Sequence, residues 1–189
     1  MNLHIRPMVP DDAERISDAE CAQGWHATPE KYRTRMRDRD AGKCIALVAE
    51  LDGEPVGYIN IYWSAEAGAF AGQNIPEIVD FGVLERCQRR GIGSALMDAA
   101  EALAATRCNR VCLGVGLHAG YGAAQRMYVL RGYIPDGSGV WYRDQVCAPY
   151  GNCVNGDDLV LYLSKNLSQQ HPEGDAPRLS QEEDSLWNH

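Results

Sequence analysis

The fold is decided by the stretch Gln88-Arg89-Arg90-Gly91-Ile92-Gly93-Ser94-Ala95-Leu96. From Ile92 to Leu103, apolar residues recur at the spacing of one helix face, which predicts a helix that ends near Arg107. The β-compatible run from Glu77 to Leu84 predicts a strand before this stretch. The order is therefore strand, short turn, glycine-rich segment and helix.

This order suits the binding of a phosphate group. The first backbone N–H groups of a helix have no acceptors within the helix, and the helix dipole adds partial positive charge there. Gly91 and Gly93 carry no side chain that would keep an anion away from these groups, while Arg89 and Arg90 add positive charge. The alternative is a glycine turn that only caps the helix. A P-loop or a dinucleotide-binding fingerprint would need residues that this stretch lacks, such as a third glycine where Leu96 stands.

The rest of the chain indicates alternating strands and helices. Asp52-Gly53 is a strong hairpin signal between two β-compatible runs, and Gly132 is a natural helix terminator. Helices are expected from the acidic cap at 10–12 to about 21, and over 29–39, 92–107 and 123–131. Strands are expected over 3–7, 44–50, 55–63, 77–84, 111–115, 139–142 and 159–164, with turn-rich loops over 64–76 and 144–158.

The glycine-rich stretch resembles the acetyl-CoA signature of the GNAT superfamily of N-acetyltransferases, which has Gln or Arg followed by two spaced glycines. Here these residues are Gln88, Gly91 and Gly93. Phe81-Gly82-Val83 resembles the family strand whose backbone pairs with the pantetheine arm, and residues 126–133 resemble the end of the family's last helix.

The resemblance covers about residues 1–166. It implies the GNAT fold, an α/β (α+β) class in which a central mixed, mostly antiparallel, twisted sheet of six to seven strands is flanked by about four helices. It also implies an acyltransferase that uses acetyl-CoA as co-substrate and needs no metal. The coenzyme-binding residues that it implies are Phe81, Gly82, Val83, Gln88, Arg89, Arg90, Gly91, Ile92, Gly93, Ser94 and Tyr121.

Tyr121 departs from the family pattern. It stands three residues before Ala124, where many members carry an asparagine. A side-chain amide contact to pantetheine is therefore replaced, in this interpretation, by the Tyr121 hydroxyl or by backbone groups of the glycine-rich turn.

Acetyl transfer to an amine requires a base, because an amine with a pKa of about 10.4 is neutral in only about one molecule in a thousand near pH 7. The first candidate is Glu77, which lies fourteen residues before Gly91, where histone-acetylating members place their catalytic glutamate. Asp80 is the second candidate, on the opposite face by strand alternation. A surface carboxylate at Glu77, a structural acid at Asp80, and a water chain with His118 remain alternatives.

The candidate acid is Tyr128, since the tyrosine that it resembles lies near the coenzyme sulfur and protonates the departing thiolate. Packing beside Met127 is the structural alternative. A bulge at Gly82 would let the backbone N–H of Val83 polarise the thioester carbonyl.

Composition limits the remaining possibilities. The 189 residues suit one domain, expected at 1–167, followed by a polar tail at 168–189 that we expect to be disordered. A net charge of -8 disfavours nucleic acid and favours a cationic partner. Since no apolar run approaches the roughly 20 residues of a membrane span and no signal-like segment is present, we expect a cytoplasmic protein without membrane contact. The odd cysteine number favours reduced thiols, with the redox state of Cys147 and Cys153 open.

The acceptor is the least determined part. A small-molecule amine such as an antibiotic, a polyamine or an amino-acid-like compound is the first hypothesis, and a peptide N-acetyltransferase or a non-catalytic acetyl-CoA sensor is the alternative. An exposed edge strand makes a homodimer possible. The residues expected around the acceptor are aromatic or carboxylate side chains and one histidine, namely Trp25, His26, Tyr32, Trp63, Glu66, Trp141, Tyr150, Asp157 and Asp158.

Overall fold

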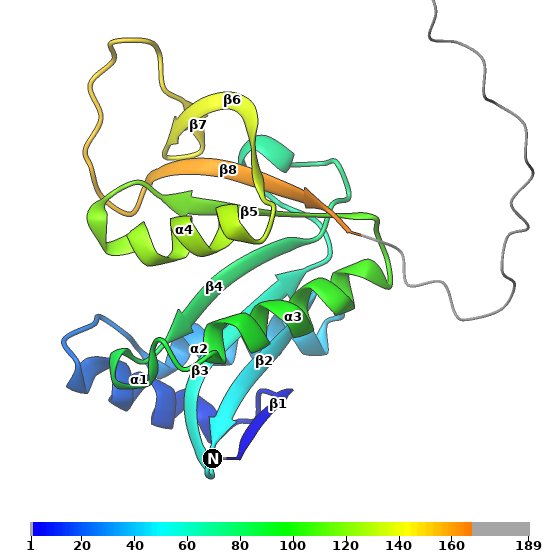
Figure 1. Ribbon diagram of the computed structural model, residues 1–189, viewed down its shortest axis with the longest axis vertical. Helices are drawn as coiled ribbons and strands as arrows, with labels where there is room; N and C mark the ends of the chain where they lie inside the picture. Colours follow the sequence, from blue (N-terminus) through cyan, green and yellow to red (C-terminus); the bar gives the residue numbers. More distant parts are fainter. Residues whose placement is uncertain (1, 168–189) are drawn as a thin grey trace, which may run out of the picture.

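Eight strands form one sheet in the computed structural model, which describes residues 2–167 (Figure 1). The strand order is β1-β2-β3-β4-β5-β8-β6-β7. All neighbouring pairs are antiparallel except β4 and β5, which run parallel. The expected mixed, mostly antiparallel sheet is confirmed. The expected disordered tail at 168–189 lies outside the described residues.

The elements follow the sequence pattern closely. The helices are α1 (Asp12–Ala22), α2 (Pro29–Asp40), α3 (Ile92–Ala105) and α4 (Gly122–Leu130). The strands are β1 (Leu3–Pro7), β2 (Cys44–Leu51), β3 (Glu54–Tyr62), β4 (Glu77–Val83), β5 (Arg110–Gly116), β6 (Ile134–Tyr142), β7 (Gln145–Val146) and β8 (Leu159–Asn166). Three short 3-10 turns are η1 (Gly68–Phe70), η2 (Glu85–Cys87) and η3 (Ala119–Tyr121).

Two strand predictions were incomplete, so the sheet has one strand more than the six to seven expected. β6 begins at Ile134 rather than at 139, because Ile134 and Pro135 already pair with β8 before the register shifts ahead of Val140. Its Pro, Asp, Gly and Ser residues form an irregular strand instead of a loop. β7 lies in the expected loop and pairs with the end of β6 across a turn in which Arg143 and Asp144 take positive φ angles.

Helices cover both faces of the sheet (Figure 1). On one face, Leu96 and Met97 of α3 and Tyr128 of α4 share a buried cluster with Leu47 of β2; we call it the α3 cluster. On the other face, α1 and α2 bury a second cluster against Val48, the next residue of β2. Successive strand residues thus point to opposite faces, as a pleated sheet requires.

Candidate active site

The parallel strands β4 and β5 separate after a short paired segment. They pair only at Glu77 with Cys112 and at Ile78 with Leu113, and the two ribbons diverge beyond this segment (Figure 1). We call the separated region, 79–83 of β4 and 114–116 of β5, the splay. The other edge of β4 pairs with β3. The β4 edge that faces the splay therefore carries backbone N–H and C=O groups that β5 does not pair, which is unusual inside a sheet.

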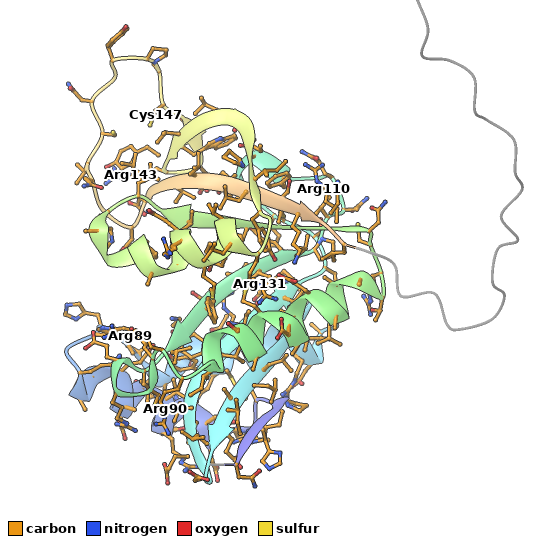
Figure 2. The ribbon with its side chains drawn as sticks, viewed as in Figure 1. Arg89, Arg90, Arg110, Arg131, Arg143 and Cys147 are labelled. Atoms are coloured by element: carbon orange, nitrogen blue, oxygen red, sulfur yellow. The ribbon has the colours of Figure 1, made fainter. Side chains whose placement is uncertain are left out.

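The phosphate-binding loop predicted from the sequence follows β4 after the short turn η2, with Arg89 and Arg90 upon it (Figure 2). Gly91 is the N-cap of the 14-residue helix α3, with a φ of 82° that glycine adopts most readily. A Cβ at Gly91 would meet nothing within 4 Å, so space remains in front of the helix. The helix start thus offers N–H groups, an open approach and two cationic side chains.

Gln88 and Gly93 have structural contacts that the sequence did not predict. The Gln88 Nε2 atom donates to the carbonyl of Val83 at 3.1 Å, which ties the loop to the end of β4. A Cβ at Gly93 would lie 3.2 Å from the Phe81 ring, so the glycine also permits close packing of α3 on β4. Strand, loop and helix start are therefore held as one unit.

A β-bulge interrupts β4 within the splay. Tyr58 of β3 pairs with Gly82 and Asn60 pairs with Val79, so two residues of β4, Asp80 and Phe81, stand opposite one of β3. A bulge was considered at Gly82, and the structure has it at Asp80 and Phe81, directly before that glycine. Asp80 has a φ of 50°, a left-handed conformation that costs a residue with a side chain roughly 1–2 kcal/mol.

The bulge changes which way the candidate bases point. Ile78 and Phe81 both pack on the α3 cluster although they are three residues apart, so alternation is interrupted once between them. Glu77 is paired with Tyr62, whose hydroxyl contacts α2, and Asp80 also contacts α2. Glu77 and Asp80 therefore lie on the same face, and the prediction of opposite faces is wrong.

Glu77 lies in an environment that favours its neutral form. Burial, with the nearby Asp144 carboxylate, raises its pKa from 4.5 to about 7. Within residues 2–167, no ion pair or hydrogen bond engages the Glu77 side chain. Burial and then Glu77 and Asp144 also raise the pKa of Tyr162 to about 12. A carboxylate with a pKa near neutrality can accept and release a proton at physiological pH.

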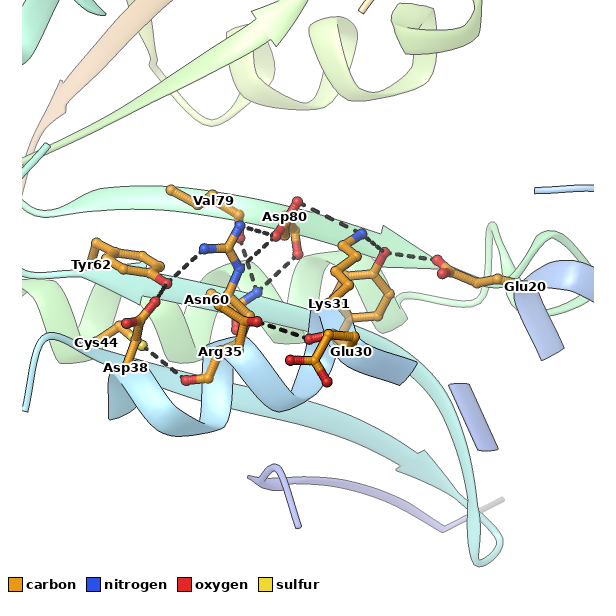
Figure 3. A network of polar contacts seen from close by, with 12 residues as sticks. Glu20, Glu30, Lys31, Arg35, Asp38, Cys44, Asn60, Tyr62, Val79 and Asp80 are labelled. Atoms are coloured by element: carbon orange, nitrogen blue, oxygen red, sulfur yellow. Dashed lines mark hydrogen bonds and ion pairs between the residues drawn. The ribbon is translucent and has the colours of Figure 1, made fainter. Parts of the chain in front are cut away.

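Asp80, unlike Glu77, has cationic neighbours (Figure 3). The Arg35 Nε atom donates to its Oδ2 at 2.7 Å, and Arg35 Nη2 lies 2.5 Å from the same oxygen. The Lys31 Nζ atom lies 3.7 Å from Oδ1. Two cationic side chains of α2 thus contact the Asp80 carboxylate.

The two tyrosines predicted at the site both belong to the α4 region. Tyr128 is buried, with its ring 6.5 Å from that of Phe81, and burial raises the pKa of its hydroxyl above the usual value. Tyr121 lies so close to β5 that a Cβ at Gly116 would meet its ring at 2.3 Å. Its hydroxyl donates to Asp157 Oδ1 at 3.0 Å, and burial followed by this contact raises its pKa to about 12.

Asp157 also accepts from His118, whose Nε2 atom lies 3.0 Å from the same carboxylate oxygen. The His118 Nδ1 atom accepts from the N–H of Gly120, so Nε2 carries the ring proton. His118 is thereby committed to a local cluster with Tyr121 and Asp157 rather than presented as a free base.

The residues expected around the acceptor do not form one cluster. Trp141 packs against Tyr162 near Glu77, but Tyr32 is buried under α1, and Trp63 packs on the α3 cluster beneath Arg107. The remaining members lie on the surface or at its margin, namely Trp25, His26, Glu66, Tyr150, Asp157 and Asp158. The sequence missed Arg35, Lys31 and Asp144 because their proximity depends on the tertiary fold.

Comparison with known proteins defines the family. The sequence profile of the Acetyltransferase (GNAT) family matches residues 11–133, about two thirds of the chain. The chain belongs to the GNAT acetyltransferase family. It is accordingly an acetyltransferase, and members of this family use acetyl-CoA. A search of curated protein sequences gives no significant match.

Solved structures share this fold over their whole length. Ard1 from Thermoplasma volcanium is 21% identical, with a TM-score of 0.65 over 89% of this chain and 99% of that one. The ribosomal-protein-S18-alanine N-acetyltransferase from Escherichia coli is 12% identical, with a TM-score of 0.63 over 94% and 100%. An N-acetyltransferase from Staphylococcus aureus Mu50 is 15% identical, with a TM-score of 0.65 over 89% and 100%. At these identities the likeness shows the fold.

The raised pKa of Glu77 predicts a pH-dependent effect of Glu77→Gln on stability. The folded protein holds the Glu77 proton more tightly than the unfolded chain, so the wild type loses stability relative to the neutral variant as pH rises from 4.5 to about 7. At about 1.4 kcal/mol per pKa unit, the difference should reach on the order of 3 kcal/mol above pH 7. Urea unfolding of both proteins between about pH 5 and 8 measures it. A difference that is constant with pH would contradict the environment described for Glu77.

Proposed function

We propose that the enzyme transfers the acetyl group of acetyl-CoA to a primary amine of a small molecule, by direct attack of the amine on the thioester. The observation that carries this proposal is Glu77, a largely desolvated carboxylate with a pKa of about 7 beside the splay. Acetyl-CoA supplies an activated carbonyl carbon and a thiolate leaving group. The remaining requirements are a coenzyme site, a base and an acid.

The splay and the loop before α3 fit the coenzyme. The unpaired β4 edge can bond to the amides of a pantetheine arm through the backbone of Phe81, Gly82 and Val83. The start of α3 and the two arginines suit its pyrophosphate. We assign coenzyme binding to Phe81, Gly82, Val83, Gln88, Arg89, Arg90, Gly91, Ile92, Gly93, Ser94 and Tyr121. Within this set, Gln88 acts by bracing the loop and Tyr121 through its ring beside Gly116.

Glu77 is the general base in this proposal, and Asp80 is not. Glu77 and Asp80 share the face opposite α3, but only Glu77 is without a cationic partner among the ion pairs of residues 2–167. A base must release a bound proton between turnovers, which a pKa near 7 permits. Tyr128 is the acid in this proposal, since its hydroxyl is protonated at neutral pH and its ring lies 6.5 Å from that of Phe81 in β4.

The charge around Glu77 supports a cationic acceptor. Glu77, Asp144 and Asp136 all contribute to raising the pKa of Tyr162, after burial, and no basic residue is among the causes of that shift. These carboxylates would attract a protonated amine before it is deprotonated. A protein N-terminus is the second candidate, supported by the likeness of the fold to ribosomal-protein-alanine N-acetyltransferases from Escherichia coli and Brucella melitensis.

A cytoplasmic location and a homodimer are further proposals. In the described part of the chain, no helix has the length and apolar character that crossing a membrane requires. The cytoplasmic location inferred from the sequence is compatible with this. β1 and β7 form the two edges of the sheet, and either could pair with a second copy.

The substrate proposal is tested by acetyl-CoA consumption against a panel of aminoglycosides, polyamines, amino acids and short peptides. We expect turnover with small cationic amines, at kcat/KM values at least about tenfold above those for peptides with free N-termini. Preference for a peptide would establish the second candidate. Tight acetyl-CoA binding without turnover of any amine would instead indicate a sensor.

The role of Glu77 predicts a specific pH–rate profile. Wild-type kcat/KM should rise through about pH 7 as Glu77 ionises, and Glu77→Gln should lose most activity at neutral pH and recover as free amine accumulates. Asp144→Asn removes a charge that raises the Glu77 pKa, so the low-pH rise of kcat/KM, the acid limb of the profile, should move to lower pH. Asp18→Asn, at an exposed aspartate of α1, is the control and should leave the acid limb of the profile in place. Identical profiles for the wild type and Glu77→Gln would exclude Glu77 as the base.

Tyr128→Phe tests the acid. The substitution retains the buried ring and removes only the hydroxyl, so folding and acetyl-CoA affinity should persist. Loss of thiolate protonation should lower kcat by roughly 10²-fold, the usual scale for one acid–base group. Steady-state kinetics with calorimetry of coenzyme binding measures both effects. Wild-type turnover by the variant would assign Tyr128 to packing alone.

A further inference from the structure

The β4 bulge is held from outside its own sheet. Asp80 takes its left-handed conformation where the register against β3 shifts, and its carboxylate is bound by Arg35 of α2 at 2.5 and 2.7 Å. Asp80 and Arg35 are each about three-quarters buried, with 24% of either side chain exposed. An ion pair at this depth is screened less than one on the surface.

Further hydrogen bonds fix the guanidinium of Arg35 in place (Figure 3). Its Nη1 atom donates to the Tyr62 hydroxyl at 2.7 Å, and that hydroxyl donates to Asp38 Oδ2 at 2.5 Å. Asp38 lies one turn after Arg35 on α2. The Arg35 side chain is therefore bound on one side to Asp80 and on the other to the end of β3.

Lys31 and Asn60 support the same arrangement. Lys31 lies 3.7 Å from Asp80 and donates to the Tyr58 hydroxyl at 3.1 Å. Asn60 is 1% exposed, and its Nδ2 atom lies 3.3 Å from both the Val79 and Asp80 carbonyls. A side-chain donor of β3 thus reaches two carbonyls at the bulge.

The bulge determines the position of the rest of β4. Only because alternation is interrupted at Asp80 can Phe81 and Val83 face α3 while Gly82 faces Tyr58. Phe81 then contacts Gly93 at the start of α3, and the Val83 carbonyl accepts from Gln88. A regular strand would turn these side chains to the opposite face.

We propose that Arg35 is a positioning residue, whose ion pair with Asp80 holds the β4 bulge and so places the β4 backbone along the splay. The consequence for catalysis rests on the acetyl transfer proposed above, in which that backbone binds the coenzyme. Arg35 contacts no reacting atom in this account. It acts through Asp80, and it links α2, on the sheet face opposite α3, to the coenzyme-binding strand.

A double-mutant cycle tests this proposal. Arg35→Met should lower kcat at least about tenfold, since it removes the ion pair that holds the bulge and leaves the Asp80 carboxylate without its main partner. In an Asp80→Gly background the same substitution should change kcat less than about twofold, because glycine adopts the left-handed conformation without help. Arg33→Met is the matched control: it removes an exposed arginine of α2 paired with Glu14, and should leave kcat unchanged.

Hydrogen exchange of the free protein gives a readout that is independent of activity. Arg35→Met should speed exchange of the amides of 79–83 at least about tenfold relative to those of β2, and should do so far less in the Asp80→Gly background. This readout also separates the two proposals. If the wild type acetylates no amine but hydrogen exchange changes as stated, the proposed function is wrong, while the role of the Arg35–Asp80 ion pair in holding the bulge is supported.

Three results would overturn the proposal. Unchanged hydrogen exchange of residues 79–83 in Arg35→Met would show that the bulge does not depend on the Arg35–Asp80 ion pair. Equal losses of kcat from Arg35→Met in both backgrounds would show that Arg35 acts independently of Asp80. A folded Asp80→Gly variant with wild-type exchange and no activity at any accessible pH would place Asp80 in the chemistry itself.

Discussion

The structure depends on the short backbone pairing between the parallel strands β4 and β5. Two residue pairs join them, after which the strands separate and leave one edge of β4 without a partner in the sheet. Unpaired backbone groups inside a fold have to be satisfied by some other group. The elements around this edge are arranged accordingly, since the start of α3 lies at its end, Tyr121 and Tyr128 of the α4 region lie across from it, and α2 fixes its bulge.

Glu77 and Asp80 show how surroundings assign different roles to similar groups. Both are carboxylates of one short strand on one face of the sheet. Asp80 is paired with two cations, whereas Glu77 is desolvated beside another carboxylate and has a pKa of about 7. Placing titratable groups in contrasting environments is how a fold obtains a structural charge and a proton acceptor from the same chemistry. The family assignment by itself would not distinguish them.

Much of the fold was predictable from local pattern. Helix periodicity, the Asp52-Gly53 hairpin and the glycine-rich loop are local signals, and the structure confirms the helices and the loop that they predict. The bulge at Asp80 was not predictable, because an aspartate at positive φ is stabilised here by an arginine that is 45 residues distant in sequence. That one irregularity reversed the predicted faces of Glu77 and Asp80. The irregular start of β6 was likewise not predictable, because its residues usually form turns.

The central claim is that coenzyme binds along the free edge of β4 and at the start of α3. It is tested most directly by titrating isotopically labelled protein with coenzyme A and following each backbone amide by NMR. The account predicts the largest shifts at Phe81, Val83 and residues 92–94, with little change in β1 and β2. Saturable binding that leaves these amides unmoved and shifts those of another surface would contradict it.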